Sequence, residues 1–581
     1  MIKLKFLLFL LHILFISLCF IILLLSALFI FKPIFQANSI IFPYSVSQFD
    51  LCSKTPTLWK YIKIAYLLTY SFSFTLLLNS LFSSIFKFKI HSIQKRKNFK
   101  PNGLHLLIGK DNEYGFPVYI SELSLYQNIL ITGTIGTGKT SSAMYPFCNQ
   151  LIHYKNDVPS KKLAMLILDV KGNFYKQVMN YCIEYGRIND LIIISLNGSV
   201  KYNPLDKPNL KPHILANRLK EILLLFSPNN TESYWLDVVE QALAEAIKLC
   251  RIYNNNYVTF LELHNLLTYK TYYTEKIAIT RNLFKLGKLS EDQVYDLLSS
   301  IKFFEANFYS LDSKILSTLK SEISRITNIF ISDHDIAKIF CPEKSEINFH
   351  GFENVLNTGK IVVLNMNIAE YKNLSKIIAA YLKLDFQAEI LLQLSKKKNT
   401  EIRTSAFVCD EYHEYVTTSD ADFFSQARES KSINIVATQS YTSLLNSLKD
   451  QYSAKVIIQN LVNKIWFRTD DIFTVEEIQK QLGKEDKIKI SKNISENADK
   501  TSYNHFTNSL ISQNSNISES ISSYTNYDFI YDFNFFTCQL KPFTCLAFLS
   551  NNSSTIHPQK LIMLPYFNQS TTFKFNKFKI I

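Results

Sequence analysis

Residues 133–140 read Gly-Thr-Ile-Gly-Thr-Gly-Lys-Thr and stand between an apolar run, 128–132, and a stretch compatible with a helix. This spacing and context are typical of a phosphate-binding P-loop. Its glycines let backbone N–H groups turn toward phosphate oxygens, its lysine adds a positive charge, and its threonine hydroxyl can ligate Mg²⁺. The chain has only 13 glycines in 581 residues, and three of them fall within 133–138, which argues against a chance glycine-rich turn. We therefore predict that ATP and Mg²⁺ bind at Gly133, Thr134, Ile135, Gly136, Thr137, Gly138, Lys139 and Thr140.

Two stretches near the N-terminus, 6–31 and 64–86, contain no Asp, Glu, Lys or Arg. Each is long enough to cross an apolar bilayer core of about 30 Å as a helix. The first is far longer than the ~7 to 15 apolar residues of a signal peptide, so we interpret residues 1–100 as a membrane anchor with two transmembrane helices. Lysines precede the first span and a basic cluster follows the second. The positive-inside rule then predicts a multi-pass protein of the cell inner or plasma membrane with its ATP site in the cytoplasm.

The remaining chain is long enough for two or three domains with a substantial core. The net charge of +14 suits a polyanion or an anionic membrane surface as a partner. The nine cysteines are scattered and lack zinc-ligand spacing, which fits reduced thiols in a cytosolic domain.

Apolar, β-rich runs recur along the part after the anchor, several of them followed by helical patterns, and this alternation predicts a mostly parallel α/β sheet. These runs are 163–168, 191–194, 361–364, 405–409, 433–436 and 465–467. Between them, residues 207–346 change to a helical period, which predicts an inserted all-α domain. One of its helices is expected to start near Ser290, where Ser-Glu-Asp-Gln has the spacing of a capping box.

The C-terminal part begins with a polar segment, 492–528, which is dominated by Ser, Asn and Thr and is expected to form a mobile surface excursion. After it, 533–536, 543–549 and 560–564 are expected to return to the core as strands.

A P-loop enzyme also needs a carboxylate near Mg²⁺ and a second group that orients the attacking water. Asp169 and the pair Asp410-Glu411 each follow an apolar run. We favour the pair, because Asp410 can complete the metal site with Thr140 while Glu411 acts as the catalytic base. The role of Asp169 stays open, and capping of the following helix suits it better than it suits Asp410.

Two further catalytic residues are predicted close by in the sequence. Gln439 directly follows the apolar run 434–438. At that position its side chain can sense the terminal phosphate or polarise the water. Arg428 stands just before that run and can reach a neighbouring subunit's phosphate as an arginine finger.

These motifs occur in a familiar order with Asp169-Val-Lys-Gly172, Tyr202-Asn-Pro-Leu205 and Thr438-Gln439-Ser440. In this order they resemble the type IV secretion system coupling proteins, the TraG/TraD-like ATPases of conjugative DNA transfer. Segments 460–468 and 474–483 are similar to the family's region after the sensor glutamine. Asn173 stands where the family usually has an acidic residue.

The resemblance implies a RecA-like nucleotide-binding domain, assigned here to 101–206 and 347–581, with the all-α domain 207–346 inserted. It also implies a homohexameric, DNA-stimulated ATPase that brings single-stranded DNA with its attached relaxase to the proteins of a type IV secretion channel at the membrane. Two alternatives stay open: a coupling ATPase for secreted protein effectors, and a non-motor platform that binds ATP to assemble a secretion complex.

Two further clusters are given structural rather than DNA-binding interpretations. The basic runs 396–398 and 484–492 are interpreted as solvated faces. The aromatic residues Phe303, Phe304, Phe308 and Tyr309 are interpreted as helical core instead of a base-stacking platform.

Overall fold

The computed structural model describes residues 103–226, 233–366, 368–371, 373–396, 401–448, 450–497, 502–504, 509–511 and 516–568, with scattered helical positions between 57 and 75. The chain divides into two compact units, Met1–Lys100 and Pro101–Ile581. The predicted span 6–31 and most of 64–86 lie outside the described residues. Within the part that is described, no helix combines the length and apolar character that crossing a membrane requires.

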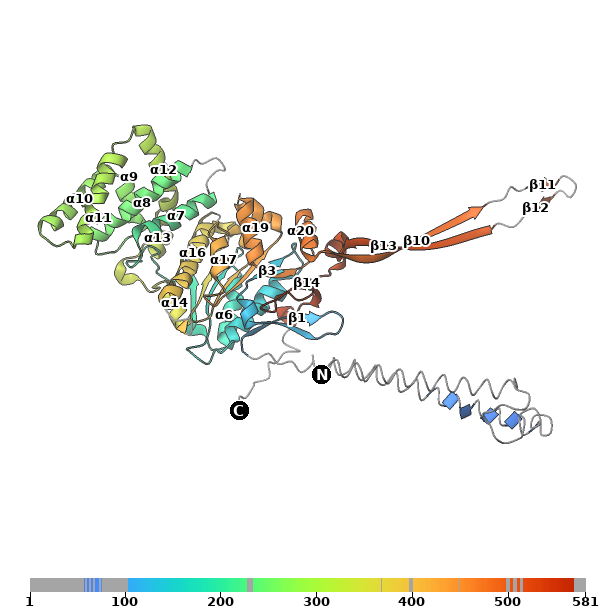
Figure 1. Ribbon diagram of the computed structural model, residues 1–581. Helices are drawn as coiled ribbons and strands as arrows, with labels where there is room; N and C mark the ends of the chain where they lie inside the picture. Colours follow the sequence, from blue (N-terminus) through green and yellow to red (C-terminus); the bar gives the residue numbers. More distant parts are fainter. Residues whose placement is uncertain are drawn as a thin grey trace, which may run out of the picture. The chain divides into compact units, whose positions relative to one another are not determined.

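An eleven-stranded sheet forms the centre of the second unit (Figure 1). Its strand order is β2-β1-β15-β14-β9-β3-β8-β7-β4-β6-β5. The strands from β9 to β5 all run parallel, and the other four add to one edge in antiparallel pairs. The predicted mostly parallel α/β sheet is therefore confirmed. The strands are β1 (His105–Asp111), β2 (Pro117–Ser121), β3 (Ile129–Thr132), β4 (Ala164–Leu168), β5 (Leu191–Ile194), β6 (Ile361–Leu364), β7 (Ser405–Cys409), β8 (Ser432–Thr438), β9 (Asn463–Trp466), β14 (Thr544–Phe548) and β15 (Gln559–Ile562).

Alternate residues of the parallel strands enter two different cores, one on each face of the sheet. In β4, for example, Leu166 packs with the core that continues into the helical domain, whereas Met165 and Ile167 pack with the core on the opposite face. Burial on both faces explains why these strands are continuous apolar runs in the sequence.

Helices cover both faces of this sheet (Figure 1). On one face lie α5 (Tyr145–His153) and α6 (Phe174–Glu184), and on the other lie α16 (Asn373–Lys396) and α17 (Asp420–Gln426). The remaining helices of this domain are α4 (Glu122–Leu125), α14 (Phe352–Thr358), α15 (Ile368–Tyr371), α18 (Tyr441–Leu448), α19 (Gln451–Asn460) and α20 (Ile472–Leu482).

Between β5 and β6 the chain forms a lobe built from helices. Its helices are α7 (Pro212–Phe226), α8 (Ser233–Tyr253), α9 (Phe260–Thr268), α10 (Lys270–Lys285), α11 (Glu291–Lys302), α12 (Ser313–Ile331) and α13 (His334–Phe340). The predicted helix start at Ser290 is confirmed, since its hydroxyl accepts from the Gln293 N–H and the Gln293 side chain accepts from the Ser290 N–H. The core assignment of Phe303, Phe304 and Phe308 is also confirmed, because all three side chains are buried.

Asp385 of α16 joins the helical lobe to the sheet domain. This fully buried carboxylate accepts hydrogen bonds from Arg218 of α7 at 2.7 Å and from the Tyr202 hydroxyl, and it pairs with Lys207 at 3.2 Å. Burial would raise the pKa of Asp385, but the adjacent Lys207 and Arg218 charges hold it below its ordinary value. The Tyr202-Asn-Pro-Leu205 motif therefore has a structural role at this joint.

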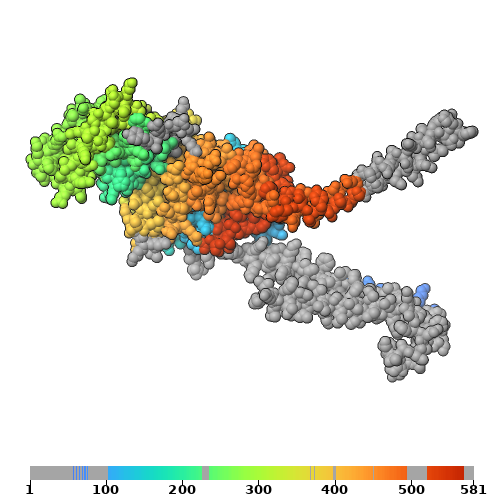
Figure 2. All heavy atoms as spheres, turned by 45° about the horizontal axis from the view of Figure 1, so that its top comes forward, coloured from blue at the N-terminus to red at the C-terminus, as the bar shows by residue number. Residues whose placement is uncertain are grey.

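The polar segment 492–528, expected to form a mobile surface excursion, lies largely in a pair of strands. β10 (Lys484–Asn497) and β13 (Asn516–Phe529) pair along their full length as an antiparallel ribbon, and β11 (Ser502–Asn504) pairs with β12 (Ser509–Ile511) beyond it. The described start of this ribbon projects from the domain surface in Figure 2. The backbone N–H and C=O groups of the two strands pair with each other. The strands therefore form although the segment has few of the large apolar side chains that the sequence analysis considered necessary for order.

The predicted strand at 533–536 is wrong. A short π-helix, η7 (Phe535–Gln539), stands there instead and buries both Phe535 and Phe536 against Trp466 and α20. Two consecutive buried aromatics do not fit the alternating pattern of a half-buried strand.

Candidate nucleotide-binding site

The predicted P-loop connects β3 to a helical segment that starts as a π-helix, η1 (Thr140–Met144), and continues as α5. Gly136 and Gly138 have φ angles of +80° and +97°, which favour glycine. A Cβ on Gly138 would lie 2.5 Å from the ring of Phe543, and a Cβ on Gly133 would lie 2.6 Å from the Cβ of Phe467. The glycines are thus required by backbone conformation and by space.

The loop leaves donors available for an anion. The backbone N–H groups of 135–138 have no acceptor among the described residues. Lys139 is buried, and its ammonium group donates to the carbonyl oxygens of Gly133 and Thr134 within the loop. Burial lowers the pKa of Lys139, and the nearby Glu411 and Asp410 carboxylates counter part of this effect. Free N–H groups around a buried ammonium fit the β- and γ-phosphates of a nucleotide.

Asp410 follows β7 and reaches the P-loop directly. Its Oδ2 accepts a hydrogen bond of 2.7 Å from the Thr140 hydroxyl, and its own N–H donates to the Leu168 carbonyl at 3.1 Å. The carboxylate is buried, which raises its pKa to about 6. Thr140 and Asp410 therefore place two hard oxygen donors side by side, as Mg²⁺ prefers.

Glu411 adopts a left-handed backbone conformation, with φ +49° and ψ +48°. Such conformations are costly for a non-glycine residue and tend to occur at functional sites. Its Oε2 is buried without a hydrogen-bond donor among the described residues, and His413 Nδ1 stands 3.7 Å away. A carboxylate oxygen held beside the P-loop without a donor is free to accept a proton from water.

Several residues that support Glu411 were not identified from the sequence. His413 lies between the Glu411 carboxylate and the Thr438 hydroxyl, which is 3.3 Å from its Nδ1. Burial lowers the pKa of His413, although the Glu414 carboxylate acts in the opposite direction. A neutral ring there leaves the negative charge of the Glu411 carboxylate in place.

The segment after Glu411 is anchored by a fully buried ion pair. Lys383 of α16 donates to Asp420, the first residue of α17, at 2.5 Å, and the Tyr412 hydroxyl donates to the same carboxylate. Gln387 donates to the other oxygen of Asp420 at 2.8 Å. This network ties the residue next to Glu411 to two helices.

Asp169 has a different environment. Its carboxylate accepts from the backbone N–H groups of Lys171, Asn173 and Phe174 at 2.9 to 3.1 Å. These bonds organise the turn into α6, in agreement with the helix-capping interpretation that the sequence left open.

Arg428 and Gln439 lie beyond opposite ends of strand β8. Thr438 pairs with Thr132, so Gln439 follows β8 beside the start of the P-loop. Arg428 precedes β8 and is exposed, and its guanidinium donates to the Asn552 side chain at 2.9 Å. The fold thus brings Gln439, but not Arg428, to the chain's own P-loop.

Comparisons with known proteins bear on this arrangement. A family model described as the TraM recognition site of TraD and TraG matches residues 405–522. The unbound monoclinic form of the bacterial conjugative coupling protein TrwBΔN70 matches with 12% identity and a TM-score of 0.52, covering 80% of this chain and 89% of that chain. TrwB with ADP and Mg²⁺ also matches at 12% identity and TM-score 0.52, covering 81% and 91% of the two chains. TrwB with the non-hydrolysable GTP analogue GDPNP gives the same identity and TM-score, covering 81% and 92%. A search of curated proteins finds no match.

The chain resembles the TraG/TraD-like type IV coupling proteins. The resemblance that the sequence motifs indicated is therefore confirmed. The support is a family model that matches residues 405–522 and a fold that is shared across most of the chain. At 12% identity the solved structures show the fold alone, a mixed α/β fold with a large, mostly parallel sheet.

Proposed function

We propose that the chain is a membrane-anchored ATPase that couples single-stranded DNA, with its attached relaxase, to a type IV secretion channel. The observation that carries this proposal is the contact between Thr140 and Asp410, with Glu411 beside it and free P-loop N–H groups opposite. The family resemblance supports the DNA cargo, and the net charge of +14 agrees with it.

The nucleotide would be held by the P-loop, and each residue has a defined task. The N–H groups of 135–138 and the Lys139 ammonium bind phosphate oxygens. Thr140 and Asp410 hold Mg²⁺, which when bound neutralises phosphate charge. Glu411 orients the attacking water and accepts its proton, and Gln439 positions the same water from the end of β8.

Arg428 completes a site in a neighbouring subunit. A seven-residue strand, β8, separates it from the P-loop edge of its own chain, a distance of about 23 Å at ~3.3 Å per residue. An exposed guanidinium that cannot reach its own site suits a ring in which each subunit supplies an arginine finger to the next. We therefore propose a homohexamer.

The anchor and the partner proteins complete the proposal. The two apolar stretches 6–31 and 64–86 hold the chain in the inner membrane with the ATPase unit on the cytoplasmic side. The matched family model is described by recognition of TraM, which supports a partner-binding role for 405–522.

Two substitutions at the nucleotide site test the proposal. Lys139→Ala removes the phosphate-facing charge and should abolish nucleotide binding, turnover and DNA transfer. Glu411→Gln should retain nucleotide binding but lose turnover, since it removes the proton acceptor with little change of shape. Binding is measured with a fluorescent ATP analogue, and turnover with and without single-stranded DNA.

Matched controls are Lys285→Ala and Glu291→Gln, which change exposed charges on α10 and α11 of the helical lobe. Both should keep parental turnover. Parental turnover in Glu411→Gln would reject the catalytic assignment, and turnover insensitive to single-stranded DNA would favour the assembly-platform alternative.

A further inference from the structure

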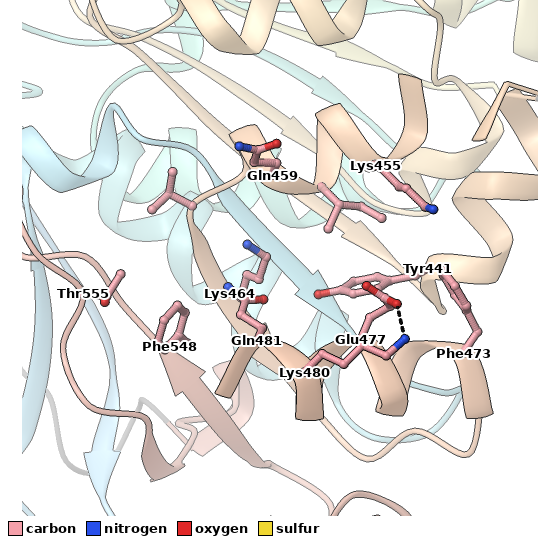
Figure 3. A pocket seen from close by; sticks show the side chains of 12 residues that line it. Tyr441, Lys455, Gln459, Lys464, Phe473, Glu477, Lys480, Gln481, Phe548 and Thr555 are labelled. Carbon is pink, nitrogen blue, oxygen red and sulfur yellow. Dashed lines mark hydrogen bonds and ion pairs between the residues drawn. The ribbon is translucent and has the colours of Figure 1, made fainter. Parts of the chain in front are cut away.

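A cavity lies on the sheet domain, apart from the P-loop. It has a volume of about 520 Å³ and is bounded by α18, α19, α20 and the strands β9 and β14 (Figure 3). None of the P-loop residues lines it. Its lining combines aromatic side chains with amines and amides, and the residues on which the inference rests are Tyr441, Phe473, Phe548, Lys464, Gln459 and Gln481.

Lys464 is the unusual residue of this cavity. It is the second residue of β9 and is only 4% exposed, yet its ammonium group has no acceptor among the described residues. Gln459 of α19 and Gln481 of α20 line the same cavity (Figure 3). Burial without a counter-charge lowers the pKa of Lys464 to about 8. An ammonium on a side chain that is 4% exposed and has no counter-charge is costly, so the fold alone does not explain why lysine stands there.

The charges at the mouth of the cavity also favour an anion. Lys455 adds a second positive charge from the exposed side of α19. On α20, Glu477 and Lys480 pair with each other at 2.9 Å, so they contribute no net charge. The aromatic rings of Tyr441 and Phe473 supply an apolar wall beside these polar groups.

We propose that this cavity binds a carboxylate group of a partner protein together with the apolar side chain next to it. The aromatic wall and the small number of lining cations fit a carboxylate next to an apolar side chain better than a phosphodiester chain. One ammonium in a cavity that is also lined by aromatic rings and by the amides of Gln459 and Gln481 matches a singly charged carboxylate with an apolar side chain next to it. A nucleic-acid path needs a series of cations along the backbone, whereas Lys464 and Lys455 are the only lining cations of this cavity that are not paired with the lining carboxylate Glu477.

The site does not depend on nucleotide hydrolysis, so it is tested without nucleotide. The probes are the dipeptide acetyl-Leu-Phe with a free C-terminal carboxylate, its amide, and acetyl-Leu-Phe-Asp amide, whose only carboxylate is a side chain. Binding of each probe to the purified full chain is measured by saturation-transfer NMR. At least one carboxylate probe should bind saturably below about 10 mM, and the uncharged amide should not. The two carboxylate probes distinguish a chain terminus from an acidic side chain.

Lys464→Met should weaken binding of that probe by roughly 30-fold or more, because it removes the buried charge partner. Lys176→Met is the matched control and should leave binding unchanged, and ATP-analogue binding verifies the fold of each variant. Lys464→Gln replaces Lys464→Met if the latter fails to fold. Equal binding by parent and Lys464 variants, or absence of saturable binding by both carboxylate probes, overturns the proposal. Direct binding of an oligo-dT to the parent chain that competes with the probe and is lost in Lys464→Met would assign the cavity to nucleic acid instead.

Discussion

Lys464 offers a direct test of the electrostatics because replacing it should stabilise the protein. Burial lowers its pKa from the ordinary 10.5 to about 8. At about 1.4 kcal/mol for each pH unit, this drop corresponds to a folding cost of about 3 kcal/mol for the charged amine. Methionine has a similar length and no charge, so Lys464→Met should remove the cost while filling the same space.

The sign of the effect depends on pH in a defined way. Below pH 8 Lys464 is protonated in both the folded and the unfolded chain, so the full cost is present and Lys464→Met gains about 3 kcal/mol. Between pH 8 and 10.5 the folded chain releases the proton first, and the advantage of the variant declines. Above about pH 10.5 the amine is neutral in both states and the advantage disappears.

The assay is urea unfolding of the parent chain and Lys464→Met from pH 6 to 10.5, followed by the fluorescence of tryptophan, since the buried Trp466 is in the same strand. Other titrating groups are shared by both proteins and cancel in the difference. A difference that is independent of pH, or a variant less stable than the parent at pH 7, would refute the argument that Lys464 is buried without a partner.

Three further predictions concern the site and the anchor. Gly138→Ala should weaken ATP-analogue binding by about 1–3 kcal/mol, because the residue needs a positive φ and its Cβ would meet a phenylalanine ring; parental affinity would contradict the loop geometry. Asp420→Asn should destabilise the chain by about 3–5 kcal/mol in urea unfolding, because it leaves the Lys383 charge buried without its counter-ion, whereas a change below about 1 kcal/mol would show that the pair is hydrated. A reporter fused after Lys100 should be cytoplasmic and one at Ser47 external, and a cytoplasmic signal at both would reject two spans.

The sequence was most informative where the determinants of structure are local. The parallel strands were predicted because burial on both faces requires continuous apolar runs. No strand was predicted at β1 or β2, and β1 contains a glycine, Gly109. The structure shows why glycine stands there: a Cβ would lie 2.7 Å from the Ile562 carbonyl oxygen of the paired strand.

The candidate site divides in the same way. The P-loop and the Asp410-Glu411 pair were identified because each motif is continuous in sequence. His413, Lys383 and Lys464 were not, because nothing in their local sequence sets them apart. Lys383 meets its partner 37 residues away, and Lys464 is defined by the absence of a partner in the folded chain. Their environments arise only from tertiary packing.

Arg428 provides the sharpest test of the proposed ring. Its position before β8 places it across the sheet from its own P-loop, so a role in catalysis requires a neighbouring subunit. When Arg428→Ala subunits are mixed with Lys139→Ala subunits, a site is complete only where an Arg428→Ala P-loop receives the arginine of a Lys139→Ala neighbour. In an equal mixture about one quarter of the interfaces have this order, since each interface in a ring joins two different faces. ATPase activity should therefore rise to about a quarter of the parental value if the sites act independently.

The control mixes Lys139→Ala with Glu411→Gln, two lesions that belong to the same site, and should show no rescue. Both mixtures are assayed with single-stranded DNA after subunit exchange has been demonstrated by fluorescence transfer between labelled chains. Activity of the first mixture no higher than that of the control would reject the trans-acting arginine and the ring motor inferred from it.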